Sequence, residues 1–159
     1  RDRLKSFGIK AGDKVVIVSE NRPEWIIADI AINLIGAITV PAYTTNTEDD
    51  HHYILEHSDA KAVIASNNIL ANRLALATTR TNHCKILITL DKYSGFEPEN
   101  LRIINFNEVS DFGKNTIETS LDYLNNINPD DVSCIIYKSV TGGLPKGVIL
   151  THKNIYSNL

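Results

Sequence analysis

Short runs of β-branched and other apolar residues alternate with segments of helical periodicity along this chain, and this alternation limits its fold more than any other feature. The run KVVIVS, which follows Gly12 and Asp13, is typical of a strand buried on both faces. Strands are predicted over residues 14–19, 38–40, 61–65, 85–90, 102–106, 132–137 and 148–150. Most connections are too long for hairpins and have helical patterns, so neighbouring strands should be parallel. We therefore predict an α/β fold with a doubly wound, largely parallel sheet.

Helix-start and strand-stop signals place the intervening elements. Asn21 is predicted to cap the first long helix, and Pro41 is expected to end the second strand. Thr47 is expected to open a helix, because the acidic run 48–50 after it suits the positive end of the helix dipole. Further helical patterns cover residues 68–79, parts of 108–126 and the segment after Thr151.

The composition is that of a globular protein. The chain has 159 residues, of which 43% are hydrophobic and 22% charged, which argues against a disordered protein. No repeat or linker divides it, so residues 1–159 are expected to form a single partial domain without an internal boundary. The formal net charge of -3 gives no basic surface for a polyanion, and nucleic acid is therefore not expected as a partner.

The apolar stretches and the two cysteines favour a location in the cytoplasm. The longest apolar stretch, residues 25–40, contains Asp29 and Asn33 and is too short and polar for a transmembrane segment. No signal-peptide pattern is visible. Cys84 and Cys134 form neither a disulfide framework nor a metal-binding spacing. We expect two reduced, largely buried thiols in a cytoplasmic protein, with peripheral association at a membrane as an open alternative.

The segment from Lys138 to Gly147 is the candidate for chemistry. It follows a strand that is apolar on both faces, and ligands of open α/β sheets bind beyond the carboxyl ends of strands. Its glycines allow phosphate to approach the backbone, its hydroxyl groups can donate hydrogen bonds, and Lys146 adds positive charge. It is not a Walker P-loop, because Gly147 follows Lys146. The composition predicts either a phosphate-binding loop or a plain flexible connection.

Residues 137–154, with the sequence YKSVTGGLPKGVILTHKN, resemble the phosphate-binding signature of the adenylate-forming (AMP-binding) superfamily. Residues 12–25, 36–43 and 53–61 resemble, in family order, three earlier segments of acyl-CoA synthetases. The VPAY and TNT sequences are most similar to long-chain fatty acyl-CoA synthetases. The resemblance implies that the chain is part of the large N-terminal domain of an adenylate-forming enzyme.

The same resemblance implies a reaction and a set of binding residues. The parent enzyme would activate a fatty acid with ATP and Mg²⁺ and then transfer the acyl group to coenzyme A, releasing pyrophosphate and AMP. Hydroxyl, backbone-approach and cationic positions of the signature fall on Ser139, Thr141, Gly142, Gly143 and Lys146. No catalytic set is complete in this chain, so the chain is expected to be an inactive N-terminal fragment that needs the C-terminal part of the same enzyme.

Three residues depart from the family pattern. Lys138 stands where a hydroxyl residue is usual, Val140 where glycine is usual, and Gly142 where threonine is usual. Val140 is expected to intrude on the phosphate path, and Gly142 to lack a donor, so Val140→Gly and Gly142→Thr should improve the site. Two alternatives stay open: a decayed, non-catalytic remnant, and an unrelated α/β phosphate-binding module.

A metal site is not expected. His51, His52 and His57 fall on one predicted helix, but their spacing does not place all three on one face. We therefore expect solvated histidines. The acidic run 48–50 is interpreted as a helix start and not as a cation site.

Overall fold

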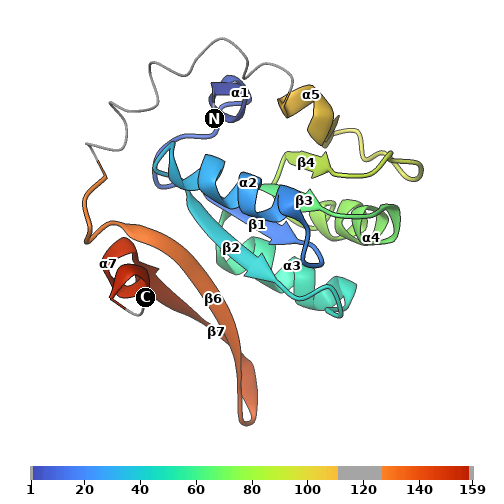
Figure 1. Cartoon of the computed structure of the whole chain (residues 1–159). Coiled ribbons are helices and arrows are strands. Elements are labelled where there is room, and N and C mark those ends of the chain that lie inside the picture. The colour runs from blue at the N-terminus through green and yellow to red at the C-terminus, as the bar shows by residue number, and fades with distance from the viewer. Residues whose placement is uncertain (1, 111–126, 158–159) are drawn as a thin grey trace.

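A computed structural model describes residues 2–110 and 127–157 of the chain (Figure 1). A seven-stranded sheet in the order β5-β4-β3-β1-β2-β6-β7 forms its centre. The strands are β1 (Lys14–Val18), β2 (Ile38–Ala42), β3 (Ala60–Ala65), β4 (Ile86–Thr89), β5 (Arg102–Asn105), β6 (Val132–Val140) and β7 (Gly143–Thr151). Neighbouring strands are parallel except β6 and β7, which are antiparallel. The predicted largely parallel α/β sheet is confirmed.

Helices cover both faces of the parallel strands (Figure 1). The described helices are α1 (Asp2–Ser6), α2 (Pro23–Asn33), α3 (Glu48–His57), α4 (Asn68–Thr78), α5 (Phe106–Ser110) and α7 (His152–Tyr156). Val15 and Ile17 belong to the hydrophobic core on the α2 side, whereas Val16 and Val18 belong to the core on the α3 and α4 side. This alternation explains why the strands are apolar on both faces. Most of the predicted helical segment 108–126 lies outside the described residues.

Of the three helix caps predicted from the sequence, two are confirmed and one is wrong. Thr47 caps α3 and forms a capping box with Asp50, as the acidic run indicated. Thr151 caps α7 in the same way through Asn154. The prediction that Asn21 caps α2 is wrong, because Arg22 occupies the cap position and makes no side-chain cap hydrogen bond. The helix start is instead set by Pro23, whose missing N–H costs nothing in the first turn.

Pro41 does not end the second strand, since β2 continues to Ala42. The N–H of Ile38 donates to the carbonyl of Asp13. Backbone N–H groups alternate in direction along a strand, so every second N–H group from Ile38 onward points toward β1. Pro41 therefore turns its nitrogen toward the β6 side, where β2 pairs with β6 at Thr39. Proline is tolerated at this position because the hydrogen bonds from β2 to β1 do not use the nitrogen of residue 41.

The segment 138–147 is not the long loop that its composition indicated. β6 runs to Val140 and β7 begins at Gly143, leaving only Thr141 and Gly142 as the turn of a hairpin. The two strands are adjacent in the chain and antiparallel, so they satisfy each other's backbone groups almost to the tip. In Figure 1 this hairpin is a long arm that extends away from the parallel strands.

Candidate functional site

The five residues assigned to phosphate binding lie at or beside the tip of the β6–β7 hairpin. Ser139, Thr141, Gly142, Gly143 and Lys146 are all solvent-exposed. Gly142 has φ of +78°, the value found at the third position of a type II turn. The glycine is therefore required by the turn itself, because a side chain at this φ is strained.

A register shift reshapes the hairpin just before the tip. Lys138 pairs with Lys146, but Val140 pairs with Gly143, so Leu144 and Pro145 together lie opposite the single residue Ser139. This is a β-bulge on β7. Pro145 fits such a position because it has no N–H to offer the ladder.

Lys138 and Lys146 place two positive charges side by side. They are directly opposite partners in the hairpin register, so their side chains start from the same face. Among the described residues, no carboxylate lies within ion-pair distance of either ammonium group. A pair of uncompensated cations beside a glycine turn is suited to bind a polyphosphate.

Side chains from α3 hold the base of this tip. The buried Tyr137 of β6 makes a 2.7 Å hydrogen bond between its hydroxyl and Nδ1 of His57. Burial raises the pKa of Tyr137 to about 12, so its hydroxyl keeps its proton. Gly147 lies opposite Tyr137, and a Cβ there would come within 2.9 Å of Ile135 Cγ2. The absent side chain therefore makes room for the packing of β6.

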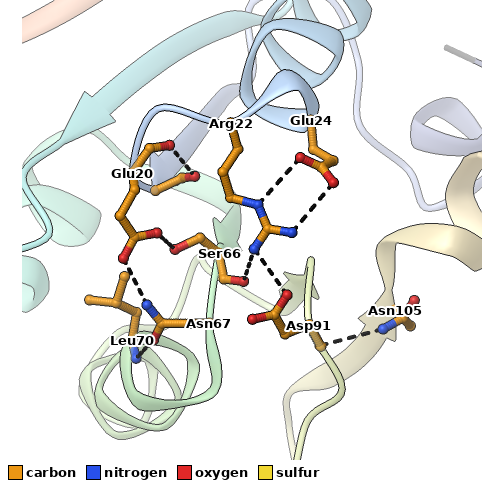
Figure 2. Close-up of polar contacts among 9 residues, drawn as sticks. Glu20, Arg22, Glu24, Ser66, Asn67, Leu70, Asp91 and Asn105 are labelled. Carbon is orange, nitrogen blue, oxygen red and sulfur yellow. Dashed lines mark hydrogen bonds and ion pairs between the residues drawn. The ribbon is translucent and has the colours of Figure 1, made fainter.

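A second polar cluster lies at the carboxyl ends of β1 and β3, where the strand order reverses (Figure 2). Glu20 accepts hydrogen bonds from Ser66 and from Asn67 Nδ2, the latter at 2.8 Å. The Ser66 hydroxyl is the main reason that the pKa of Glu20 lies below its usual value. The sequence analysis missed this cluster, although the polar residues that follow two buried strands were visible in it.

Arg22 completes the cluster from the start of α2. Its guanidinium group donates to the carbonyl of Ser66 at 3.1 Å and to Asp91 Oδ1 at 2.9 Å, and it also contacts Glu24 (Figure 2). The charged groups are thus paired with one another. The cluster ties the loops after β1, β3 and β4 together, and we assign it a structural role.

His51 differs from its expected environment. The residue is 1% exposed, and neither ring nitrogen has a hydrogen-bond partner among residues 2–110 and 127–157. Burial, together with the nearby positive charge of Arg73, lowers the pKa of His51 to about 4. The expectation of a solvated histidine is wrong here because α3 turns this residue toward the protein interior.

No described group of three His, Cys, Asp or Glu side chains could hold a metal ion. The acidic run 48–50 serves the α3 start as expected, with Asp50 in the capping box and Glu48 and Asp49 paired with Arg80. Of the helices in residues 2–110 and 127–157, none has the length and apolar character needed to cross a membrane.

Comparison with known proteins identifies the family of the chain over almost its whole length. Residues 2–159 match the model of the AMP-binding enzyme family. The chain is 32% identical to the long-chain-fatty-acid–CoA ligase ACSBG2 of Gallus gallus over 89% of its length, and 31% identical to the long-chain-fatty-acid–CoA ligase FadD15 of Mycobacterium tuberculosis over 96%. It spans only 18% and 24% of these two relatives.

Solved structures share the fold. A putative long-chain-fatty-acid CoA ligase from Rhodopseudomonas palustris superposes with a TM-score of 0.76 at 22% identity, covering 99% of this chain and 36% of the other. The A-PCP didomain of carboxylic acid reductase from Segniliparus rugosus, solved with AMP, gives a TM-score of 0.77 at 20% identity, covering 94% and 23%. The central sheet and its hairpin therefore belong to a fold found in these enzymes.

Proposed function

The chain belongs to the AMP-binding enzyme family, and we propose that its β6–β7 tip holds the β- and γ-phosphates of ATP in a long-chain fatty acid–CoA ligase. The observation that carries this proposal is the Lys138–Lys146 pair, exposed beside the turn at Gly142 and without carboxylate partners in the described chain. The similarity to ligases of Gallus gallus and Mycobacterium tuberculosis supports the fatty acid as substrate class.

Each tip residue has a role that follows from its chemistry. Ser139 and Thr141 donate hydroxyl hydrogen bonds to phosphate oxygens, and Gly142 and Gly143 leave the backbone open to close approach. Lys146 supplies charge that offsets the negative charge of the pyrophosphate leaving group. The tip contributes positioning and charge while a fatty acid carboxylate attacks the α-phosphorus.

The other ligands belong to the same proposal. The tip residues are hydroxyl, amide and ammonium donors, a set that fits phosphate oxygens and not a bare cation. Mg²⁺ bound to the phosphates would neutralise their charge during the reaction. Coenzyme A would accept the acyl group from the adenylate. We further propose that these steps require sequence that the longer relatives carry outside the matched part.

Two further expectations remain proposals. A cytoplasmic location is supported by the free thiols of Cys84 and Cys134, and peripheral association at a membrane stays an open alternative to it. The decayed, non-catalytic remnant stays the second candidate, because Val140 and Gly142 depart from the family signature.

Calorimetric titration with MgATP and with tripolyphosphate tests the site. The unaltered chain should bind both, and Lys146→Ala should weaken binding by about tenfold, the loss of one charge-assisted hydrogen bond. Lys92→Ala, which removes an exposed lysine outside the hairpin, is the matched control. Equal affinity of the Lys146 variant and the control, or no binding by the unaltered chain, would favour the remnant. Pyrophosphate release that depends on added fatty acid would contradict the expected inactivity of the chain alone.

A further inference from the structure

Three aromatic side chains join α3 to the β6–β7 hairpin, and we call Tyr53, His57 and Tyr137 the ring cluster. The rings of Tyr53 and His57 are stacked with centroids 5.2 Å apart. The Tyr137 ring meets both edge-on, with centroids 6.2 Å from Tyr53 and 5.6 Å from His57. Such edge and stacked contacts favour one relative orientation of helix and hairpin.

Two hydrogen bonds extend the ring cluster to both strands of the hairpin. On β6, the Tyr137 hydroxyl and His57 Nδ1 are 2.7 Å apart. With a neutral His57 that carries its proton on Nε2, Tyr137 donates and Nδ1 accepts. On β7, the Tyr53 hydroxyl donates to the carbonyl of Pro145 at 2.9 Å. One helix therefore holds both strands at the level where the bulge begins.

Beyond the ring cluster, the tip has little other support. The side chains of Ser139, Thr141 and Lys146 are exposed, and in the part of the chain that the structure describes they make no hydrogen bond to another element. Pro145 is the residue immediately before Lys146, and it lies in the bulge opposite Ser139. A hydrogen bond that fixes the Pro145 carbonyl thus fixes the peptide from which Lys146 extends.

We propose that Tyr53 and His57 are positioning residues for the phosphate-binding tip, acting through the Pro145 carbonyl and the Tyr137 hydroxyl. This inference rests on the proposed function of the tip. Neither side chain touches phosphate in this proposal. They reduce the number of orientations that the tip can adopt before ATP arrives, and a preorganised site loses less entropy on binding.

Amide hydrogen exchange of the ligand-free chain tests the ordering step. Tyr53→Phe keeps the stacked ring and removes only the hydroxyl, and we expect exchange at Ser139, Thr141 and Lys146 to become about fivefold faster. Exchange in β1 should not change. Tyr43→Phe, at an exposed tyrosine outside the ring cluster, is the matched control. Unchanged exchange at the tip would overturn the proposal, and so would equal acceleration in β1 and the tip.

His57 offers a test by conservative rescue. Asparagine places an acceptor near the position of Nδ1, whereas leucine fills the space without one. His57→Leu should accelerate exchange at the tip, and His57→Asn should restore much of the protection. If leucine protects the tip as well as asparagine does, the residue acts by packing alone and the proposal fails for His57.

Binding of MgATP links the ordering to the function. Affinity should fall about fivefold in Tyr53→Phe and remain unchanged in Tyr43→Phe. Faster exchange at the tip without a loss of affinity would overturn the positioning role. Failure of the unaltered chain to bind MgATP would instead overturn the proposed function, so the two failures give different readouts.

Discussion

Lys138 and Lys146 face each other across the two strands of the β6–β7 hairpin, one register pair below the bulge. Directly opposite residues have Cβ atoms about 4.5–5.5 Å apart, and like charges at that distance disfavour the hairpin. Repulsion between the two ammonium groups therefore lowers the stability of the hairpin slightly, and a bound polyanion would remove this repulsion. If the tip binds phosphate as proposed, Lys138, which departs from the family signature, would be its second cation beside Lys146.

Replacing Lys138 with the hydroxyl residue usual in the family should separate these two effects. Lys138→Ser should weaken tripolyphosphate binding by several-fold at low salt, and the loss should shrink as ionic strength rises. Its stability in urea should stay within about 0.5 kcal/mol of the unaltered chain. Titration at two salt concentrations measures the first effect, with Lys92→Ser as control. Binding that is the same or tighter in Lys138→Ser would show that Lys138 is not part of the site.

Introducing threonine at Gly142 should harm the hairpin. No atom lies within 4 Å of a Cβ built there, but the φ of +78° is unfavourable for a β-branched residue by about 1–2 kcal/mol. This reverses the expectation from the family signature that Gly142→Thr improves the site. Urea unfolding should show the loss, and Gly142→Asn should lose less, because asparagine tolerates this φ. Equal stability of the threonine variant would mean that the turn can change its type.

Acid should destabilise the chain through His51 before the carboxylates respond. The folded-state pKa of about 4 lies below the ordinary value of 6.5, so the unfolded chain binds the proton more tightly. Stability should therefore be complete above pH 6.5 and fall by about 3 kcal/mol as the pH is lowered to 4. Carboxylates with lowered pKa, such as Glu20 and Asp50, lose their contribution only at lower pH.

Substitution of His51 tests that assignment. His51→Leu should flatten the stability profile between pH 6.5 and 4, measured by urea unfolding at several pH values. His152→Gln, which changes a histidine outside α3, should keep the slope of the unaltered chain. A slope that persists in His51→Leu would assign the titration to another group.

Removing Arg22 should loosen the polar cluster at the ends of β1 and β3. The side chain is 30% exposed, so its ion pair with Asp91 is partly screened, and we expect Arg22→Ala to cost about 1 kcal/mol of unfolding free energy. Arg22→Lys should recover little, because an ammonium group cannot donate in the same forked geometry to Ser66, Asp91 and Glu24. Full recovery by lysine would show that charge alone matters.

The parallel sheet was predictable because its strands have a strong and local signal. β1 is a short β-branched run and β3 a short, mostly apolar run rich in alanine, and their burial on both faces follows from that pattern. The capping box of Thr47 was predictable for the same reason, since its partners lie within four residues.

The hairpin tip was not predictable in the same way. Glycine, serine and threonine are favoured in long loops and in tight turns alike, so composition did not show that Gly142 closes a two-residue turn. The burial of His51 and the contact between Tyr53 and Pro145 depend on how α3 packs against strands that are distant in the chain. Periodicity places such residues on a helix but does not show what they contact.

The pairing of β2 with β6 at Thr39 and Cys134 joins residues that are far apart in sequence, whereas β6 and β7 are neighbours. Contacts between neighbouring segments form early, because little chain entropy is lost in closing a short loop, and distant contacts form late. We expect the hairpin to form before it docks on the parallel strands. The same order in reverse allows the hairpin to detach while β1 to β5 remain folded, so the tip proposed to bind phosphate would be the first part of the described chain to lose its structure on heating.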